Sequence, residues 1–344
     1  MLYVTTRSND DAYTAQRILR DRRGSDGGLF VPFRCPVLTR EEIYALSDRK
    51  FNDRVAHIIN LLFNTRLTGY DIDLAAGRYC VRLNRLNGRL IMAECWHNTR
   101  WTFSQMVDAI VDLIRVDKES VSRPGDWAEV AVRIAGLFGI FGDLIHDDLV
   151  DMERKMDVSV LAGDFSAPMS AWYARKMGLP IGNIICCCNE NSGLWDFICH
   201  GQLRTDGIAK QTMVPEGDVA VSIGIERLIF EFGGVEEVKR YLTSLRSGRS
   251  YYADDRLMRQ MRQGIYVTVN SDSRIRNTIP NVWGTFSCLM APCAALCYAG
   301  LQDYRARTGE GHCAVVISEK SPRIYAESMT EILDITRQEL ENRL

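Results

Sequence analysis

Apolar residues recur every three or four positions in several long segments of the chain. In residues 51–63 this spacing places the apolar side chains on one face of a helix. The same spacing predicts helices over residues 103–114 and 127–141, and one long helix over residues 324–344 that closes the chain. Within the helix predicted over residues 127–141, glycine recurs at every third position from 136 to 142, which favours close helix packing over a phosphate-binding loop.

Compact apolar runs alternate with these helices and predict buried strands. The runs at residues 158–162 and 184–188 are each followed by a polar turn and then by a helical segment, over residues 167–177 and 193–200. Strand, loop and helix thus occur twice in succession, which is typical of a parallel α/β sheet. Further strands are predicted at residues 2–5, 90–95 and 314–317, and polar loops at residues 204–216, 247–255 and 270–280.

Composition sets the class of protein without identifying it. The 344 residues are 46% hydrophobic and 25% charged, as in ordinary globular proteins. The length suits one large domain or two smaller ones; we expect an N-terminal segment, residues 1–100, and an α/β core, residues 101–344, joined in one compact unit. A net charge of −2 offers no basic excess for nucleic acid or an anionic membrane, and we expect no partner of either kind.

The eleven cysteines are expected to be reduced thiols. The N-terminus has no charged segment followed by an apolar one, so no signal peptide is predicted and a cytoplasmic location is expected. Cys186, Cys187 and Cys188 are consecutive on a predicted strand, so their side chains alternate between its faces and cannot converge on one metal ion. Cys293 and Cys297 share a helix face and are interpreted as small buried residues.

No metal site is predicted. The acidic cluster near residue 150 is interpreted as a solvated helix start, where acids match the helix dipole, because a metal motif with known spacing is absent. The members of this cluster are His146, Asp147, Asp148 and Asp151.

Ligand chemistry is expected first at the turns that follow the two central strands. In open α/β sheets ligands collect beyond the carboxyl ends of strands, against helix N-termini. Gly163 lets a ligand approach the backbone of the first turn, whereas Asp164 would repel a phosphate. Asn189 and Asn191 follow the second strand and either bind the same ligand or form a turn that caps the next helix. His97 follows another strand and is either a proton carrier or a structural residue.

Several segments, taken in order, resemble the threonine synthases. Residues 3–7 and 26–32 resemble that family's Tyr-x-Ser-Thr-Arg-Gly opening and its Gly-Gly-Leu-Tyr/Phe-Val-Pro element. Residues 163–181 resemble its Gly-Asn-Phe-Gly segment with the following helix. The Asn-x-Asn-Asp-x-Leu-x-x-Phe and Asp-Ile-x-x-Ser-Ser-Asn-Phe-Glu-Arg elements are matched by residues 189–197 and 218–227.

The resemblance implies a fold type II, pyridoxal phosphate (PLP)-dependent core like that of the tryptophan synthase beta subunit. Enzymes of this family make threonine from phosphohomoserine and hold PLP as an imine on a lysine, which also moves protons. In the matching segment here, Glu94, His97 and Phe103 keep the family register, but Ser104 stands at the lysine position and Gln105 replaces an acid. A hydroxyl cannot form an imine, so no covalently bound PLP is expected.

Two further parts of the family pattern are altered. Residues 116–124 lead almost directly into a helix that the family places after a small mobile subdomain, so this subdomain is predicted to be largely deleted. The phosphate-binding segment has Asp164 and Ser166 where the family has Asn and Gly. The resemblance implies that Gly163, Asp164, Phe165 and Ser166 would bind a ligand, together with Asn189, Asn191, Ser318 and Glu319.

These changes lead to three functional hypotheses. The first is a threonine synthase-like protein without threonine synthase activity, whose remnant cleft binds a small ligand, phosphorylated or an amino acid, or a partner. The second is an enzyme repurposed to PLP-independent chemistry through His97, Ser104, Asp164 or a thiol, with Glu94 in support. The third is an active PLP-dependent lyase with its lysine elsewhere, at Lys118 or Lys320. Loss of a subdomain would expose apolar surface, so a homodimer is expected.

Overall fold

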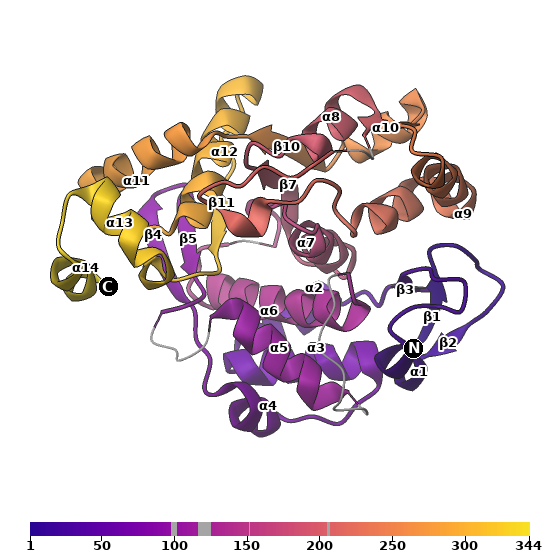
Figure 1. Cartoon of the computed structure of the whole chain (residues 1–344). Coiled ribbons are helices and arrows are strands. Elements are labelled where there is room, and N and C mark those ends of the chain that lie inside the picture. The colour runs from indigo at the N-terminus through magenta and orange to yellow at the C-terminus, as the bar shows by residue number, and fades with distance from the viewer. Residues whose placement is uncertain (98–101, 116–124, 151, 205–206) are drawn as a thin grey trace.

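The computed structural model describes the chain except residues 98–101, 116–124, 151 and 205–206. Its centre is a six-stranded sheet in the order β10-β7-β6-β11-β5-β4 (Figure 1). Neighbouring strands are parallel except β4, which pairs antiparallel with β5. The six strands are β4 (Arg82–Asn87), β5 (Leu90–Glu94), β6 (Met156–Leu161), β7 (Ile181–Cys188), β10 (Ile265–Val269) and β11 (Ala314–Ser318). The predicted α/β class with a mostly parallel sheet is therefore confirmed.

Helices cover both faces of this sheet and enclose two hydrophobic clusters. One cluster lies between the sheet and a helical layer that includes α3, α5, α6 and α7, and the other lies under α11, α12 and α13. Cys186 and Cys188 belong to the first cluster and Cys187 to the second, as their alternation along a strand requires. The helices are α1 (Ala15–Asp21), α2 (Arg40–Ser47), α3 (Phe51–Phe63), α4 (Gly69–Ala76), α5 (Phe103–Ile114), α6 (Trp127–His146), α7 (Ser166–Lys176), α8 (Gly193–His200), α9 (Ile225–Arg246), α10 (Asp255–Met261), α11 (Asp272–Phe286), α12 (Pro292–Thr308), α13 (Ala326–Leu333) and α14 (Arg337–Arg343).

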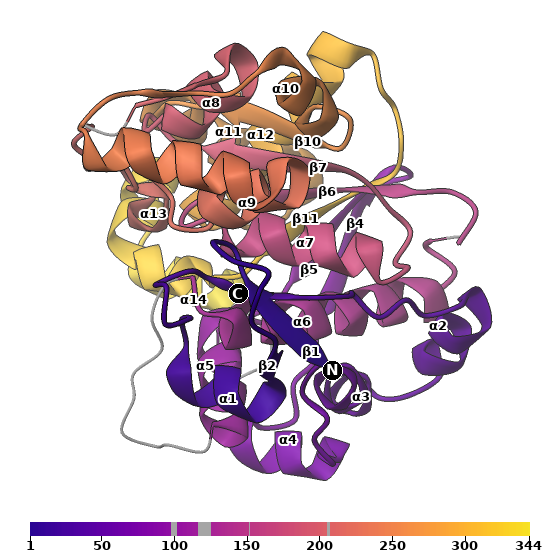
Figure 2. The same ribbon diagram turned by 90° about the vertical axis from the view of Figure 1, so that its right-hand side faces the viewer.

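A small sheet formed by the N-terminal segment lies beside the helical layer (Figure 2). Its strands are β1 (Leu2–Thr5), β2 (Tyr13–Thr14) and β3 (Phe30–Pro32), and a separate pair joins β8 (Gln202–Leu203) to β9 (Tyr251–Tyr252). β5, from the expected N-terminal segment, pairs with β11 near the other end of the chain. The boundary expected near residue 100 thus falls inside one sheet and one hydrophobic cluster, and it stays a prediction.

Three sequence-based expectations were wrong about local structure. Residues 270–280, expected as a loop, belong mostly to α11, because Ser271 caps its N-terminus and its apolar residues bury one face. The helix expected over residues 324–344 is divided into α13 and α14, since Asp334 has a positive φ of 52°. His146 lies in the last turn of α6 and Asp147 and Asp148 follow it, so these members of the acidic cluster mark a helix end and not a start. Asp151 lies outside the described residues.

The glycine spacing in α6 reflects close packing, as predicted. A Cβ atom added at Gly139 would come within 2.4 Å of the Phe51 ring, and one at Gly136 within 2.7 Å of the Phe103 ring. Glycine at these positions lets α3 and the start of α5 approach the α6 backbone.

Gly139→Ala should therefore lower the free energy of unfolding by about 1–3 kcal/mol, because the added methyl overpacks the α3–α6 contact. Gly284→Ala is the matched control, since Gly284 also lies within a helix but a Cβ added there would meet no atom within 4 Å. We expect it to stabilise the protein by about 0.5–1 kcal/mol, because alanine loses less backbone entropy than glycine. Urea denaturation of both variants measures the difference, and equal effects of the two substitutions would contradict this account of the α6 glycines.

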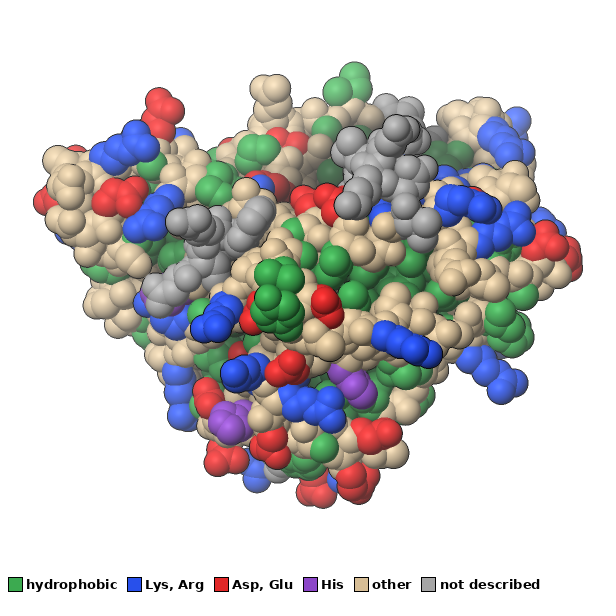
Figure 3. All heavy atoms as spheres, turned by 90° about the horizontal axis from the view of Figure 1, so that it is seen from below, with side chains coloured by type: hydrophobic (Ala, Val, Ile, Leu, Met, Phe, Trp, Pro, Cys, Tyr) green, Lys and Arg blue, Asp and Glu red, His purple; other side chains and the backbone are tan. Residues whose placement is uncertain are grey.

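The surface carries charges of both signs. On the face shown in Figure 3, basic and acidic side chains are interspersed. None of the helices in the described part of the chain has the length and apolar character needed to cross a bilayer.

Candidate active-site cavity

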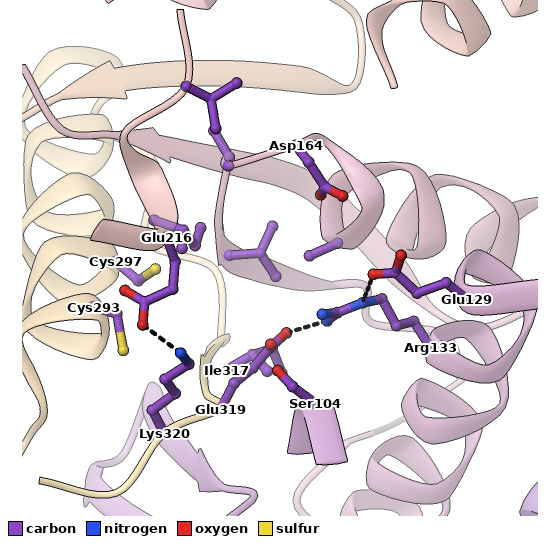
Figure 4. Close-up of a pocket in the computed structure, with 16 residues that line it drawn as sticks. Ser104, Glu129, Arg133, Asp164, Glu216, Cys293, Cys297, Ile317, Glu319 and Lys320 are labelled. Atoms are coloured by element: carbon purple, nitrogen blue, oxygen red, sulfur yellow. Dashed lines mark hydrogen bonds and ion pairs between the residues drawn. The ribbon is translucent and has the colours of Figure 1, made fainter. Parts of the chain in front are cut away.

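A cavity of about 220 Å³ lies beyond the carboxyl ends of β6 and β11 (Figure 4). Helices α5, α6, α7 and α12 also contribute to its wall. The position agrees with the expectation that ligands collect at this edge of a parallel sheet. Its lining residues are Ser104, Glu129, Arg133, Val160, Leu161, Ala162, Gly163, Asp164, Ala167, Glu216, Val219, Cys293, Cys297, Ile317, Glu319 and Lys320.

Arg133 of α6 holds two carboxylates on one side of the cavity. Its Nη1 donates to Glu319 Oε1 at 2.6 Å, and its Nε donates to Glu129 Oε1 at 3.1 Å, one helical turn earlier. The guanidinium also lies over the Phe103 ring, 5.6 Å from its centroid. Burial raises the pKa of Glu129 to about 7; Arg133 opposes this effect, and the nearby charges of Asp164 and Glu319 add to it. Two carboxylates therefore share one guanidinium, and the charge of Asp164 lies near them.

Lys320 and Glu216 form a second ion pair on the other side of the cavity. The Lys320 Nζ donates to Glu216 Oε1, which also accepts from the Tyr325 hydroxyl at 2.7 Å. Burial alone would raise the pKa of Glu216, but the hydrogen bonds from Lys320 and Tyr325 outweigh it and lower that pKa. The Glu216 Oε2 is buried and accepts no hydrogen bond from the described residues. One acceptor at the cavity thus lacks a donor within the described part of the chain.

The turn between β6 and α7 is filled by its own aspartate. Asp164 Oδ1 accepts from the Ser166 backbone N–H and Asp164 Oδ2 from the Ser166 hydroxyl, each at 2.9 Å. Gly163 and Phe165 have positive φ values of 45° and 73°, and the Gly163 carbonyl accepts from Ser222. Gly163 and Asp164 line the cavity, whereas Phe165 and Ser166 are buried in the turn and do not. The Asp164 carboxylate therefore already accepts from the Ser166 N–H at the start of α7, a donor that would otherwise be available to an anionic ligand.

Ser104 faces the same cavity from the first turn of α5, beside Glu319 (Figure 4). The helix starts at a capping box in which Thr102 accepts from the Gln105 N–H and Gln105 Oε1 accepts from the Thr102 N–H at 2.9 Å. Gln105 thus supports the helix start that positions Ser104. The predicted lysine position therefore lies in the cavity wall, but it carries a hydroxyl.

The other residues chosen from sequence lie outside the cavity wall. Glu94 is buried at the end of β5, where it accepts from Arg82 at 2.5 Å and Asn84 at 3.2 Å. Burial lowers the pKa of His97, and the charge of Arg82 acts in the same direction. The Ser318 hydroxyl is buried and accepts from the Trp96 indole at 3.1 Å. Glu94, His97 and Ser318 thus belong to the support around β5 and β11, while Glu319 reaches the cavity.

Asn189 and Asn191 form an internal network of hydrogen bonds. Asn189 Nδ2 donates to Thr212, to the Val214 carbonyl and to Asp218, and its Oδ1 accepts from the Asn191 backbone and side chain. These bonds use the polar atoms of Asn189, which is fully buried. Asn189 thus orders the turn, as in the second alternative, but the pair does not cap α8, whose N-cap residue Ser192 makes no side-chain capping hydrogen bond.

Sequence reasoning did not select the residues that dominate the charge of the cavity, namely Glu129, Arg133 and Glu216. Glu129 and Arg133 are four residues apart and so share a helix face, but the apolar stripe of the same helix concealed this signal. Cys293 and Cys297 were predicted as small buried residues, which is confirmed, and both also line the cavity. Burial raises the pKa of the Cys293 thiol to about 12, so this sulfur is held as the unreactive thiol. No cluster of metal ligands is found among the described residues.

Comparison with known proteins agrees with this architecture. Residues 2–75 match the family model for the threonine synthase N terminus. A threonine synthase-like 1 protein of Mus musculus is 33% identical over 107 residues, 30% of this chain and 14% of that protein. The chain thus spans far less than two thirds of the length of the first relatives that it matches. A threonine synthase of Pseudomonas aeruginosa is 26% identical over 390 aligned positions, 86% of this chain and 83% of that protein.

The fold is shared with solved threonine synthases. The PLP-bound enzyme from Brucella melitensis superposes with a TM-score of 0.85 at 16% identity, covering 97% of this chain and 92% of that one. A parallel sheet with a cavity at its carboxyl edge and this neighbour define a fold type II protein. The N-terminal match and the relatives above support membership of the chain in the threonine synthase family.

The comparison also bears on the predicted deletion. The alignment with the Pseudomonas enzyme is longer than the 344 residues of this chain, so that enzyme has positions without a counterpart here. The position of the unmatched residues is not given by this alignment, so deletion of the small subdomain stays a prediction. The junction predicted from sequence, residues 116–124, lies outside the described residues.

Proposed function

We propose that this chain is a threonine synthase-like protein without threonine synthase activity, and that its cavity binds a small molecule without an imine. One observation carries the proposal: Ser104 lies in the cavity wall where the family resemblance requires a lysine. An alcohol does not condense with an aldehyde to an imine, so the step that holds PLP in the family has no nitrogen at this position.

The residues present also fit the PLP phosphate poorly. Asp164 places a carboxylate on the Ser166 N–H, at the turn where the resemblance puts the phosphate. A dianionic phosphate would meet this like charge at close range, and like charges in a partly buried site repel by several kcal/mol at an effective dielectric constant of about 20. This poor fit to the phosphate supports a protein that does not use PLP, although the structurally similar Brucella enzyme binds it.

Lys320 is the amine that a relocated imine would need, because it lines the same cavity. Its Nζ is already engaged in an ion pair with Glu216, so this amine is not free in the cavity. The second candidate, Lys118, lies outside the described residues. PLP-independent chemistry by His97 with Ser104 has less support, since His97 is not among the residues that line the cavity.

Added PLP should give no internal-aldimine absorbance with the full-length protein, and borohydride should fix no pyridoxyl group to any peptide. Absorbance spectra and peptide mass spectrometry after reduction measure both. Lys320→Ala is the matched variant: any signal that it abolishes would assign the imine to that lysine. A reduced pyridoxyl-lysine in the unmodified chain, in place of the expected blank, would contradict the proposal directly.

Location and assembly are part of the same proposal. All eleven cysteines are free, which supports a reducing cytoplasm. Tyr70 and Leu74 are 68% and 69% exposed on one face of α4, and such apolar surface supports a homodimer.

A further inference from the structure

The charges that line the cavity are predominantly negative. Arg133 is paired with Glu129 and Glu319, and Lys320 with Glu216, so both cations are already engaged. Four carboxylates face these two cations: Glu129, Asp164, Glu216 and Glu319. An anionic ligand would add to an excess of negative charge, whereas a cation would reduce it.

In the described part of the chain, one buried acceptor at the cavity lacks a donor, and a second carboxylate accepts only from neutral groups. Glu216 Oε2 is buried at the cavity without a hydrogen-bond partner among the described residues. A buried acceptor without a donor costs about 1–3 kcal/mol, so a ligand that donates to it is favoured. Asp164 lines the cavity from the turn between β6 and α7. Its carboxylate accepts from the hydroxyl and the backbone amide of Ser166, which are both neutral donors. The two acceptors come from different segments of the cavity wall (Figure 4).

The rest of the cavity wall is apolar and suits the aliphatic part of a ligand. Val160, Ala162 and Ile317 line the cavity between the charged groups. A bare metal ion would leave this surface in contact with water, and no cluster of metal ligands occurs among the described residues. A short alkyl chain ending in an ammonium or amidinium group fits both the apolar wall and the carboxylates.

We propose that the cavity binds a small organic cation, a primary amine or amidine, whose charged group donates to Glu216 and Asp164. The inference rests on the proposed function, because it gives the ligand class of the same cavity. Of the ligands expected from the family resemblance, which were a phosphorylated compound or an amino acid, it disfavours the phosphorylated one.

Proton release should accompany this binding. Glu129, with its pKa raised to about 7, is packed near Arg133 on its own helix and near the charges of Asp164, Glu319 and Arg227 from other segments. A cation in the cavity favours the ionised carboxylate and lowers this pKa. Affinity should therefore rise with pH by up to tenfold per unit below pH 7 and level off above it.

Calorimetric titration of the full-length protein with 1,4-diaminobutane at pH 8 tests the proposal. We expect binding of the diamine and none of 1,4-butanediol, its neutral counterpart, or of inorganic phosphate. Asp164→Asn should weaken diamine binding about tenfold, and Glu216→Gln should do the same independently. Glu327→Gln, which removes an exposed carboxylate from α13, is the matched control and should leave the affinity unchanged.

The outcomes separate the inference from the proposed function. Binding of phosphate, or of PLP without an imine, in place of the diamine would overturn the cation assignment and leave a ligand-binding cavity. Diamine binding that is the same in both cavity variants and in the control would place the amine elsewhere on the surface and overturn the inference. If neither diamine nor anion binds, both proposals fail. An imine that borohydride reduces to a stable pyridoxyl-lysine removes the proposed function alone.

Discussion

Replacing Arg133 by alanine should lower the free energy of unfolding by about 3–5 kcal/mol at pH 8, the largest effect expected of any single substitution in the cavity. Removal of one partner of a buried ion pair leaves the other charge buried and uncompensated. Here the Arg133 side chain is only 13% exposed and its guanidinium bonds to both Glu129 and Glu319, so two carboxylates would lose their cation together. Urea denaturation monitored by circular dichroism measures the loss.

Two further variants test the cause of this loss. Lys239→Ala removes a cation from an exposed pair with Glu236, at 2.7 Å, and should change stability by at most about 0.5 kcal/mol. Adding Glu319→Gln to Arg133→Ala should recover part of the stability, because one uncompensated charge disappears. A loss below about 1 kcal/mol in Arg133→Ala, or a double variant less stable than the single one, would show that the cluster is not held as described.

Much of the fold was predictable because local patterns agreed with tertiary packing. The helices over residues 51–63 and 103–114 have the predicted ends. An apolar stripe marks both, a capping box at Thr102 starts the second, and Asn64 in the left-handed conformation ends the first. The strands at residues 158–162 and 184–188 were found but are longer in the structure, where pairing to neighbours extends their N-terminal ends. The spacing of apolar residues therefore predicted these helices, and the length of the apolar runs predicted these strands.

The errors arose where one local signal was given too much weight. Pro280 and the polar residues of 270–280 favoured a loop, yet Ile275, Ile279 and Val282 are buried on one face of α11. Near the C-terminus, apolar spacing continues through Asp334, where the backbone reverses the sign of φ and ends the helix. A propensity is a weak prior that such packing overrides.

The candidate site was predictable in position but not in charge. Strand-loop-helix order located the turn at Gly163 and Asp164, and the family resemblance located Ser104. The ion pairs, however, join residues far apart in sequence: Arg133 and Glu319 are separated by 186 positions, and Glu216 and Lys320 by 104. The spacing of residues along the chain does not predict such long-range contacts. The excess of carboxylates in the cavity is therefore evident only in the three-dimensional structure.

Glu129→Gln should stabilise the protein at alkaline pH by up to about 3 kcal/mol and have little effect near pH 4.5. The carboxyl has a pKa of about 7 in the folded chain against an ordinary value of 4.5, with burial as the main cause. Between these two values the folded state binds more protons than the unfolded state, so stability falls as pH rises and the full penalty is present above pH 7. Each unit of pKa shift corresponds to about 1.4 kcal/mol.

Glutamine removes this penalty because it stays neutral, while its carbonyl can still accept from Arg133. Denaturant titrations of the variant and the parent chain at pH 4.5, 6 and 8 should therefore diverge as pH rises. Glu216→Gln is the matched substitution with the opposite sign, because the folded pKa of Glu216 is lowered. Its carboxylate contributes stability above the unfolded pKa, so its loss should destabilise the protein at pH 8. If both variants changed stability in the same direction at pH 8, the two sides of the cavity would not differ in charge balance as the structure indicates.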